Sequence, residues 1–491
     1  MLHFTSILVL LIGVCAFTNA QERPNIILIM ADDLGWGDPS YNSRKVFLED
    51  GITPHPDRGW IQTPNLDAMA ANGLVFDRFY SASAVCSPTR ASCLTGRNPI
   101  RVGVPGANTG KLRMDETTLS EVLKSKGYTT GHFGKWHLGT LTTLRRDANR
   151  GRRGKTAHYS GPWHHGYDEC LVTESKVPTW HPYRIVKNDL ALPVDFEDKN
   201  FYGTHYWRMP DGDPLAAKEG KVALCDEINN PEDGDDSRLI VREANEFISR
   251  AVKAEDPFFA VVWFHTPHKP IPDPEGVEAV DSPDPAKDCI EDMDDAIGML
   301  RSHLRKLGVH ENTMIWFTSD NGPENGVNSP NETSTRRSIR AGGYLERKRS
   351  LNFGGVQVPG ILEWPTKVKQ GRATQFQAVT SDYYPTILDY LQVTVPNQKP
   401  LDGISLRPVI EDSATERDHA IGFKYAKMVS WLTKDYLLVT NEKTKSFSLY
   451  DIRRDEFQRR DIAAEYPEIV STLQADLEDW LDAIKKDIPL N

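Results

Sequence analysis

Short apolar runs that alternate with amphipathic helical segments set the strongest limit on the fold of this chain. The runs at residues 25–30, 258–264 and 314–318 are almost continuously apolar, which is typical of strands buried on both faces of a parallel sheet. Helical periodicity extends from Ser237 to about Ala254 and from Pro285 to Leu307. This alternation predicts an α/β fold with a large, mostly parallel sheet between helices.

The first third of the chain repeats the same alternation at shorter spacing. Turn residues such as Gly73 and Gly127 separate its segments. The predicted order is a helix, a strand, a helix and a strand, at Pro64–Asn72, Leu74–Phe76, Glu116–Lys126 and Tyr128–Phe133.

Polar residues follow four of the predicted core strands directly. They are Asp32 and Asp33, Lys135 and His137, His268, and Asp320 and Asn321. The carboxyl ends of the strands in an open parallel sheet share one edge, where ligands bind. These acids, bases and amides are therefore expected to converge. Adjacent carboxylates after a core strand are costly unless they hold a cation, so a divalent metal with oxygen ligands is plausible at Asp32 and Asp33.

The stretch Cys86–Arg97 reads Cys-Ser-Pro-Thr-Arg-Ala-Ser-Cys-Leu-Thr-Gly-Arg. Pro88 fits the first turn of a helix, and Cys86 is expected just ahead of its N-terminus, where amide groups favour an anion. Arg90 lies one turn further on the same side. On these grounds alone, Cys86 is a buried or thiolate cysteine at a helix cap.

The whole string resembles the signature of the type I sulfatases, in which the cysteine is oxidised to formylglycine after synthesis. The other motifs follow in the family's order from Arg23 to the last helix. The resemblance implies the fold of the alkaline-phosphatase superfamily with a four-stranded C-terminal subdomain. It also implies one calcium ion per chain, with the ligands Asp32, Asp33, Asp320, Asn321 and the formylglycine made from Cys86.

The resemblance also assigns roles to five basic residues. Arg90 would hold the formylglycine hydrate and His137 would hydrogen-bond to it. Lys135 and Lys348 would bind sulfate oxygens, and His268 would protonate the leaving alcohol. Two positions depart from the family, which often has glutamate and arginine where this chain has Phe353 and Gln357. These departures bear on the substrate rather than on the reaction.

Regular periodicity is lost from about residue 141 to residue 236. This segment is either an insertion with a small satellite core or a wall of the substrate pocket with aromatic and basic side chains for sulfated sugars. The segment 173–180 resembles sulfatases that act on polysaccharides such as carrageenan or ulvan. The candidate substrate-binding residues are Trp163, His164, His165, Trp180, His181, His205, Trp207 and Arg208.

Composition and the chain ends limit the location and partners of the protein. A formal net charge of −11 gives no reason to expect nucleic acid or an anionic membrane surface as a partner. Residues 1–20 have no charged side chain and an apolar core, which predicts a signal peptide cleaved after Ala20 and a secreted or periplasmic protein. No other apolar run is long enough for a membrane span.

We therefore expect a signal peptide at 1–20, a catalytic domain at 21–416 and a C-terminal α+β subdomain at 417–491. In the subdomain, the segments 428–433, 436–440 and 447–450 alternate like antiparallel strands, and an amphipathic helix spans about Pro467–Ile484. Asn331 begins a sequon for N-glycosylation. Cys93, Cys170, Cys225 and Cys289 are expected either to form two disulfides or to be free and buried.

The sequence thus predicts a sulfatase that hydrolyses sulfate monoesters, with a sulfated polysaccharide or oligosaccharide as its substrate. Its other partner is the enzyme that converts Cys86 to formylglycine. Two alternatives stay open. One is a phosphate or phosphonate monoester hydrolase on the same fold, and the other is a non-catalytic protein that binds sulfated glycans.

Overall fold

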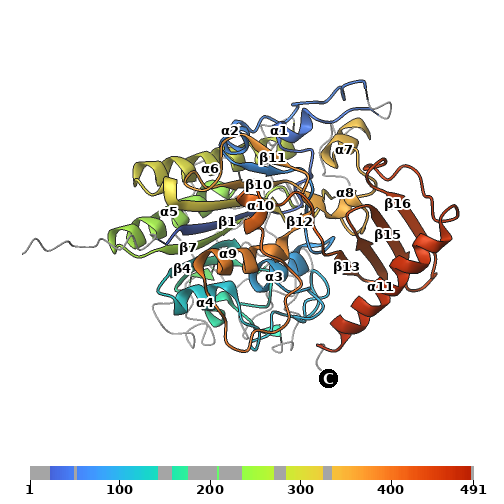
Figure 1. Ribbon diagram of the computed structural model, residues 1–491. Helices are drawn as coiled ribbons and strands as arrows, with labels where there is room; N and C mark the ends of the chain where they lie inside the picture. Colours follow the sequence, from blue (N-terminus) through green and yellow to red (C-terminus); the bar gives the residue numbers. More distant parts are fainter. Residues whose placement is uncertain are drawn as a thin grey trace, which may run out of the picture.

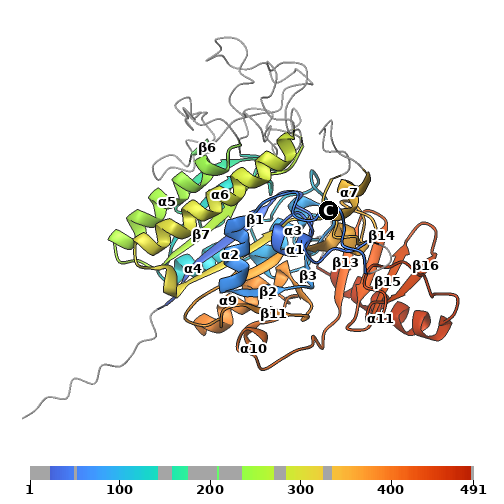
Figure 2. The ribbon, with the colours of Figure 1, turned by 90° about the horizontal axis from the view of Figure 1, so that it is seen from above.

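A large sheet forms the centre of the molecule in the computed structural model (Figure 1). The structure describes residues 23–48, 52–141, 158–174, 207–208, 235–269, 284–324 and 334–487. Helices cover both faces of the sheet, and a second, antiparallel sheet lies beside it (Figures 1 and 2). This arrangement confirms the predicted α/β fold with a small C-terminal antiparallel sheet.

The large sheet has nine strands in the order β11-β2-β10-β8-β1-β7-β4-β5-β6. The five strands from β8 to β5 pair in parallel, whereas β10 and β6 pair antiparallel with their neighbours in the order β8 and β5. The strands are β1 (Asn25–Ala31), β2 (Leu74–Phe76), β4 (Thr129–Lys135), β5 (Glu169–Thr173), β6 (Trp207–Arg208), β7 (Phe258–Trp263), β8 (Thr313–Ser319), β10 (Gly360–Glu363) and β11 (Arg372–Thr374).

Strand β1 shows why the apolar runs are continuous. Ile26, Leu28 and Met30 join the hydrophobic cluster on one face of the sheet, and Ile27 and Ile29 join the cluster on the other. Successive side chains of a strand point to opposite faces, so a strand covered on both faces has no polar position.

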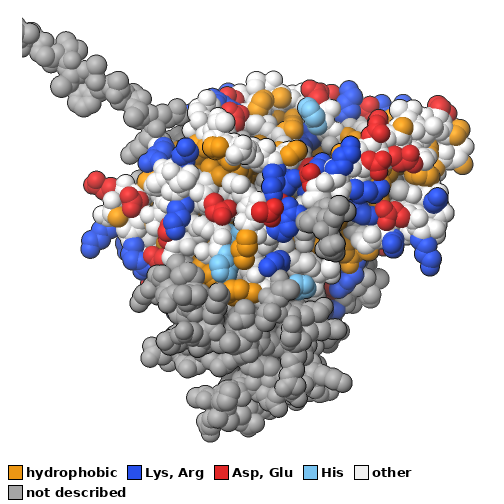
Figure 3. Space-filling model, turned by 90° about the horizontal axis from the view of Figure 1, so that it is seen from below, with side chains coloured by type: hydrophobic (Ala, Val, Ile, Leu, Met, Phe, Trp, Pro, Cys, Tyr) orange, Lys and Arg blue, Asp and Glu red, His pale blue; other side chains and the backbone are white. Residues whose placement is uncertain are grey.

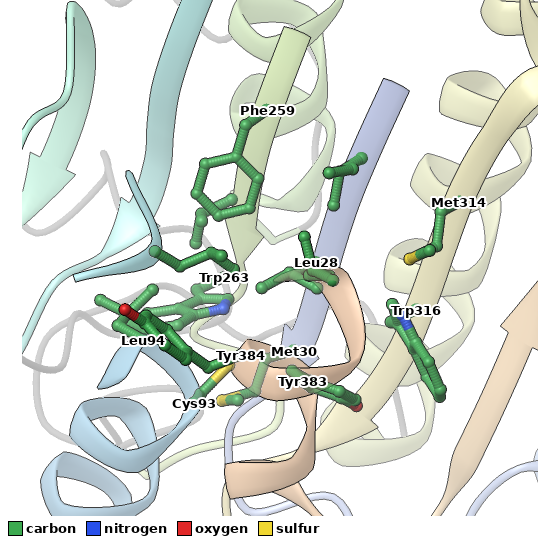
Figure 4. Packing of buried hydrophobic residues seen from close by; sticks show 14 of the residues in the cluster. Leu28, Met30, Cys93, Leu94, Phe259, Trp263, Met314, Trp316, Tyr383 and Tyr384 are labelled. Carbon is green, nitrogen blue, oxygen red and sulfur yellow. The ribbon is translucent and has the colours of Figure 1, made fainter. Parts of the chain in front are cut away.

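The helices divide between the two faces of the large sheet (Figure 1). Helices α2 (Pro64–Asn72), α5 (Ser237–Lys253) and α6 (Pro285–Lys306) pack on one face. Helices α3 (Cys86–Thr95), α4 (Leu119–Ser125), α9 (Tyr383–Leu391) and α10 (Arg407–Ile410) pack on the other. In Figure 4, Cys93 and Leu94 of α3 lie against Trp263 of β7, and Tyr383 and Tyr384 of α9 lie beneath the sheet. This packing fixes α3 below the carboxyl ends of the central strands.

Short elements connect these layers. They are α1 (Ser40–Ser43), α7 (Ser334–Arg340), α8 (Phe353–Val356), the 3₁₀ turns η2 (Pro162–His164), η3 (His310–Asn312) and η4 (Thr380–Asp382), and a three-stranded sheet of β3 (Phe79–Tyr80), β9 (Gln357–Val358) and β12 (Ala378–Val379).

The second sheet consists of β13 (Ile421–Tyr425), β14 (Met428–Leu432), β15 (Tyr436–Asn441) and β16 (Phe447–Asp451), all antiparallel. Helix α11 (Pro467–Lys485) packs on it. The last three strands and the helix match the sequence prediction. The pattern of residues did not predict β13, although the family resemblance implied four strands.

Three predictions need correction. Helix α4 begins at Leu119 rather than Glu116, because Thr118 and Glu121 form a capping box that starts the helix there. Cys86 is the first residue of α3 instead of preceding it. The alternative of two disulfides is wrong, since Cys93, Cys170 and Cys289 are free and buried, as is Cys86; Cys225 lies outside the described residues.

Among the described helices, none combines the length and the apolar character that crossing a bilayer requires. On the face shown in Figure 3, Lys and Arg side chains lie among Asp and Glu side chains. The predicted signal peptide and the sequon at Asn331 lie outside the described residues.

Candidate active site

The polar residues that follow the core strands meet at one edge of the large sheet, as predicted. Asp32 and Asp33 follow β1, Asp320 follows β8, and Lys135 ends β4. The backbone ties these ends together, since Asp320 N–H donates to Ala31 O over 3.1 Å. Cys86, at the start of α3, lines a cavity of about 620 Å³ that opens over this edge.

Three buried carboxylates form the centre of the site. One oxygen each from Asp32, Asp33 and Asp320 lies within 4.8 Å of the others. Asn321 Nδ2 donates to Asp33 Oδ1 over 2.7 Å, which turns its own oxygen away from that carboxylate. Asp32 Oδ1 and Asn321 Oδ1 are buried and receive no hydrogen bond within the described part of the chain.

Two buried oxygens without a donor, beside two further carboxylates, are costly in a protein interior unless a cation sits among them. Oxygen ligands of this kind suit a hard divalent ion such as calcium. The residues therefore fit the metal site that the resemblance implied.

Three buried cations surround the carboxylates. Arg90 donates from Nε and Nη2 to Asp320 Oδ2 over 3.0 and 2.6 Å. Lys135 Nζ lies 2.5 Å from Asp32 Oδ2, and Lys348 Nζ lies 2.7 Å from Asp33 Oδ2. Each cation therefore has a carboxylate partner, which offsets the cost of burying both charges.

Burial and these ion pairs lower the pKa of some of the buried groups and raise the pKa of others. Burial alone would raise the pKa of Asp33, but Lys348 and His268 hold it well below its ordinary value. The pKa of Asp320 rises to about 7, because burial and the neighbouring charge of Asp32 outweigh Arg90. Despite its own burial, Lys135 has a raised pKa because Asp32 faces it.

The Cys86 side chain points from the first turn of α3 into the same space. Burial raises the pKa of its thiol, against the opposing effect of Lys135 and Lys348. Burial therefore favours the protonated thiol over the thiolate that a helix N-terminus would stabilise. Pro88, two residues further, needs no amide partner in this first turn.

Two histidines line the cavity near Cys86. His268 Nε2 lies 3.7 Å from Asp33 Oδ2. His137 adopts a positive φ of 55°, its ring lies 3.3 Å from Asn108 Oδ1, and its carbonyl accepts from Ser87 Oγ over 2.6 Å. The positive φ is unusual for a residue with a Cβ, and such backbone is concentrated at functional sites.

The structure thus brings together ten predicted catalytic and metal-binding residues. They are Asp32, Asp33, Cys86, Arg90, Lys135, His137, His268, Asp320, Asn321 and Lys348. Phe353 and Gln357, where the chain departs from the family pattern, are buried away from the cavity lining. Gln357 Nε2 donates to Tyr344 Oη instead.

The candidate pocket residues of the irregular segment are not brought to the described cavity lining. His165 is buried, hydrogen-bonds to Ser160 and has its pKa lowered to about 3 by burial. Trp163 and His164 pack beside it in η2. Trp207 and Arg208 form edge strand β6, and their side chains are outside what the structure describes, as are Trp180, His181 and His205 entirely.

The sequence analysis missed one wall of the cavity, which Arg349, Lys424, Tyr425 and Ala426 supply. The last three come from β13 and the turn after it, the strand that the residue pattern did not predict. The signal in the sequence that could have indicated Arg349 is its position directly after Lys348.

Comparison with known proteins agrees with this geometry. The model of the family described as Sulfatase matches residues 24–393, about three quarters of the chain. The chain belongs to the sulfatase family. A second model, of the N-sulphoglucosamine sulphohydrolase C-terminal region, matches residues 343–486 of this sulfatase.

Curated relatives are sulfuric ester hydrolases, and so is this sulfatase. It is 30% identical to N-acetylgalactosamine-6-sulfatase of Canis lupus familiaris over 408 residues, which cover 80% of this chain and 67% of the relative. It is 32% identical to human arylsulfatase A over 410 residues, which cover 82% and 70% of the two chains.

Solved structures share the fold. The crystal structure of Ps i-CgsB in complex with k-i-k-neocarrahexaose superimposes with a TM-score of 0.70 at 23% identity, covering 93% of this sulfatase and 92% of that chain. The phosphonate monoester hydrolase of Agrobacterium radiobacter gives a TM-score of 0.59 at 19% identity, covering 95% and 96%. Both likenesses concern the fold alone.

Proposed function

We propose that this sulfatase hydrolyses sulfate esters of a polysaccharide or oligosaccharide, with a formylglycine made from Cys86 as nucleophile and one calcium ion in the site. The observation that carries the proposal is the cluster of Asp32, Asp33 and Asp320 beneath Cys86, with a lysine or arginine bound to each carboxylate. A sulfate ester is an anion, so its hydrolysis needs this concentration of positive charge.

Asp32, Asp33, Asp320 and Asn321 would hold the calcium ion, together with the oxygen of the formylglycine. Asp32 Oδ1 and Asn321 Oδ1 support this assignment, because both are buried without a donor. When bound, calcium supplies a Lewis acid that offsets the charge of the sulfate oxygens.

The formylglycine hydrate and the basic residues around it would carry out the remaining steps of hydrolysis. The hydrated formylglycine carries two hydroxyls on one carbon. The oxygen of one hydroxyl would attack sulfur and give up its proton to water, while the S–O bond to the alcohol breaks. The other hydroxyl would then lose its proton to water as the C–O bond to sulfate breaks, which releases sulfate and restores the aldehyde. Addition of water to the aldehyde would regenerate the hydrate. Arg90 positions the hydrate, while Lys135 and Lys348 hold the sulfate oxygens. An unmodified serine would instead be left as a stable sulfate ester.

His268 would protonate the leaving oxygen, because its ring borders the cavity next to Asp33. A sugar alkoxide is a poor leaving group, so general-acid assistance contributes roughly 10²- to 10⁴-fold. His137, which also lines the cavity, would hydrogen-bond to the hydrate.

The glycan substrate is supported by the relatives. Ps i-CgsB binds a neocarrahexaose, and another structural neighbour binds D-glucosamine-2-N,6-O-disulfate. A carrageenan-like or ulvan-like substrate, met outside the cytoplasm after cleavage of residues 1–20, agrees with the apolar N-terminal segment.

Two measurements test the proposal. Mass spectrometry of the Cys86 peptide from active protein should show the aldehyde in place of the thiol. Cys86→Ala should abolish sulfate release from 4-nitrophenyl sulfate, whereas Cys93→Ala, a change at a buried cysteine of the same helix, should retain it. An unmodified thiol in fully active protein would refute the nucleophile.

The competing enzyme is a phosphate or phosphonate monoester hydrolase, whose fold this chain shares. Comparison of kcat/KM for 4-nitrophenyl sulfate and 4-nitrophenyl phosphate separates the two. We expect the sulfate to be preferred, and preference for the phosphate by orders of magnitude would overturn the proposed reaction. Absence of turnover of any ester by matured protein would instead favour the glycan-binding alternative.

A further inference from the structure

One wall of the active-site cavity carries positive charge that the proposed mechanism does not use. The described lining residues include four lysine and arginine side chains and no carboxylate. Lys135 and Lys348 bind Asp32 and Asp33 at the base of the cavity. Arg349 and Lys424 are the other two, and neither contacts the metal-binding carboxylates.

The wall comes from two distant parts of the sequence. Arg349 lies in the loop before α8, and Lys424 lies near the end of β13 in the C-terminal sheet. Strand pairing fixes Lys424 opposite Val429 on β14. Ile100, Pro105 and Ala107, here termed the apolar wall, also line the cavity. The cavity lining therefore combines a charged part and an apolar part.

Ion pairs hold both cations in place. Arg349 Nη1 lies 2.5 Å from Glu324 Oε1, and Lys424 Nζ lies 2.7 Å from Glu442 Oε1. A guanidinium has five N–H donors and an ammonium has three. These contacts, the only side-chain hydrogen bonds of the two cations in the described part of the chain, leave donors for a ligand anion.

The backbone under this wall is strained at two positions. Arg349 has a φ of 75° and Ala426 a φ of 52°. Ala426 begins the two-residue connection between the paired residues Tyr425 and Met428, where a tight hairpin turn favours glycine. Positive φ is unfavourable for a residue with a Cβ, and it persists where the surroundings, often a ligand site, require it.

We propose that Arg349 and Lys424 form a second anion subsite, which binds a further oxyanion on the same glycan as the sulfate that is cleaved. This inference rests on the proposed function, since it specifies a substrate with at least two anionic groups. The apolar wall would meet the sugar face, and the charged wall would meet the second sulfate or a carboxylate. Hydrogen bonds to charged groups contribute about 1.5–3 kcal/mol, so roughly a tenfold gain in affinity follows.

The test measures binding rather than turnover, by calorimetry with the full-length Cys86→Ala variant in calcium buffer. The probes are three disaccharides with the same cleavable sulfate. One has no other anion, one has a second sulfate, and one has a uronate carboxylate. We expect the disaccharide with two sulfates to bind at least about tenfold more tightly than that with one. The uronate probe shows whether a carboxylate occupies the subsite as well as a sulfate.

Lys424→Gln in the same background should reduce this tenfold ratio to less than about threefold, and Lys424→Arg should restore it. Lys427→Gln is the matched control, because Lys427 carries the same charge in the same turn but is exposed and outside the cavity lining. It should keep the full ratio. If Lys424→Gln fails to fold, the same affinity ratio is measured with Arg349→Gln, in which it should also fall.

Three results would overturn the subsite. The first is equal affinity for the disaccharides with one and two anions. The second is an affinity ratio in Lys424→Gln that is the same as in the parent Cys86→Ala variant. The third is a fall of this ratio in Lys427→Gln that equals the fall in Lys424→Gln. Failure of the proposed function looks different. Matured protein would then not hydrolyse 4-nitrophenyl sulfate, whatever the binding ratio in Cys86→Ala.

Discussion

Charge balance at the base of the cavity explains why the site suits a sulfate ester. Asp32, Asp33 and Asp320 are all but inaccessible to solvent, and Arg90, Lys135 and Lys348 each bind one of them. With Asp320 ionised, as calcium binding requires, the three negative charges and the three positive charges cancel. A divalent cation held by the same carboxylates would leave two positive charges, which match a sulfate monoester as negative charge develops on its oxygens.

At this scale the sequence predicted the residue types but not their pairing. Asp32 and Asp320 follow recognisable buried strands, so their position at the sheet edge could be inferred. That Lys135 binds Asp32 while Lys348 binds Asp33 depends on side-chain conformations and on contacts 103 and 315 residues apart. Such pairing has no periodic signal in the sequence.

The proposed role of His268 as general acid gives a prediction that depends on the leaving group. His268→Ala should lower kcat/KM for a glycan sulfate by roughly 10²- to 10⁴-fold, because the sugar oxygen leaves poorly without a proton. The loss with 4-nitrophenyl sulfate should be much smaller, since nitrophenolate leaves readily. Steady-state kinetics with both substrates measure the difference, and His419→Ala, at an exposed position, is the control. Equal losses with both substrates would exclude a role for His268 as the general acid.

At the scale of elements, backbone hydrogen bonds hold the C-terminal end of helix α3, which is the end opposite Cys86. Gly96 ends the helix with a φ of 68°, and its amide donates to Ser92 O. The backbone amides of Asp402 and Gly403 in turn donate to Gly96 O, each over 3.0 Å. The helix that carries Cys86 and Arg90 is therefore held at the end opposite the cavity.

Gly96→Ala should consequently destabilise the protein more than an equivalent change elsewhere. A Cβ at Gly96 would lie 3.0 Å from Tyr384 Cβ, whereas one at Gly308, with a φ of 74°, would meet no atom within 4 Å. Both substitutions carry the cost of positive φ, about 1 kcal/mol. We expect crowding to add roughly another 1–2 kcal/mol at Gly96 alone. Urea unfolding of both variants measures this, and equal losses would show that Tyr384 moves aside at no cost.

Helices and core strands were predictable where the local signal was strong. Proline opens α2 and α6 in their first turn, and the two faces of β1 are both apolar. Strand β13 was missed because its residues alternate between buried and half-buried positions within a short segment that contains Gly422. Trp480 of α11 occupies the space above that glycine, so the reason for it lies almost sixty residues away.

At the scale of the whole molecule, the C-terminal sheet completes the cavity instead of lying apart from it. Arg417 Nη1, at the start of this region, lies 2.7 Å from the buried carboxylate of Asp382, just before α9. Asp487, beyond α11, binds Arg97 and Arg101 over 2.7 and 2.5 Å. These ion pairs place Lys424 and Tyr425 at the rim of the cavity. Contacts across such sequence separations could not be read from the pattern of residues.

The proposed metal site would also link the stability of the whole chain to pH. A ligand that binds only the folded state stabilises it by about 2.7 kcal/mol at a concentration of 100 Kd. The pKa of Asp320 is about 7 in the metal-free fold, against 3.8 ordinarily. Between these values the folded chain holds a proton that the unfolded chain has lost. The metal-free fold is therefore favoured at low pH and loses that advantage as pH rises toward 7.

Calcium requires the ionised carboxylate. We therefore expect its stabilisation to be complete above pH 7 and to shrink by about 1.4 kcal/mol for each pH unit below 7. Thermal unfolding with calcium or with a chelator, at pH 8 and pH 6, measures the difference in Tm. Asp320→Asn should lose both the calcium effect and its pH dependence, whereas Asp412→Asn, at an exposed carboxylate, should keep both. The same calcium-induced rise in Tm at the two pH values would show that Asp320 is already ionised at pH 6.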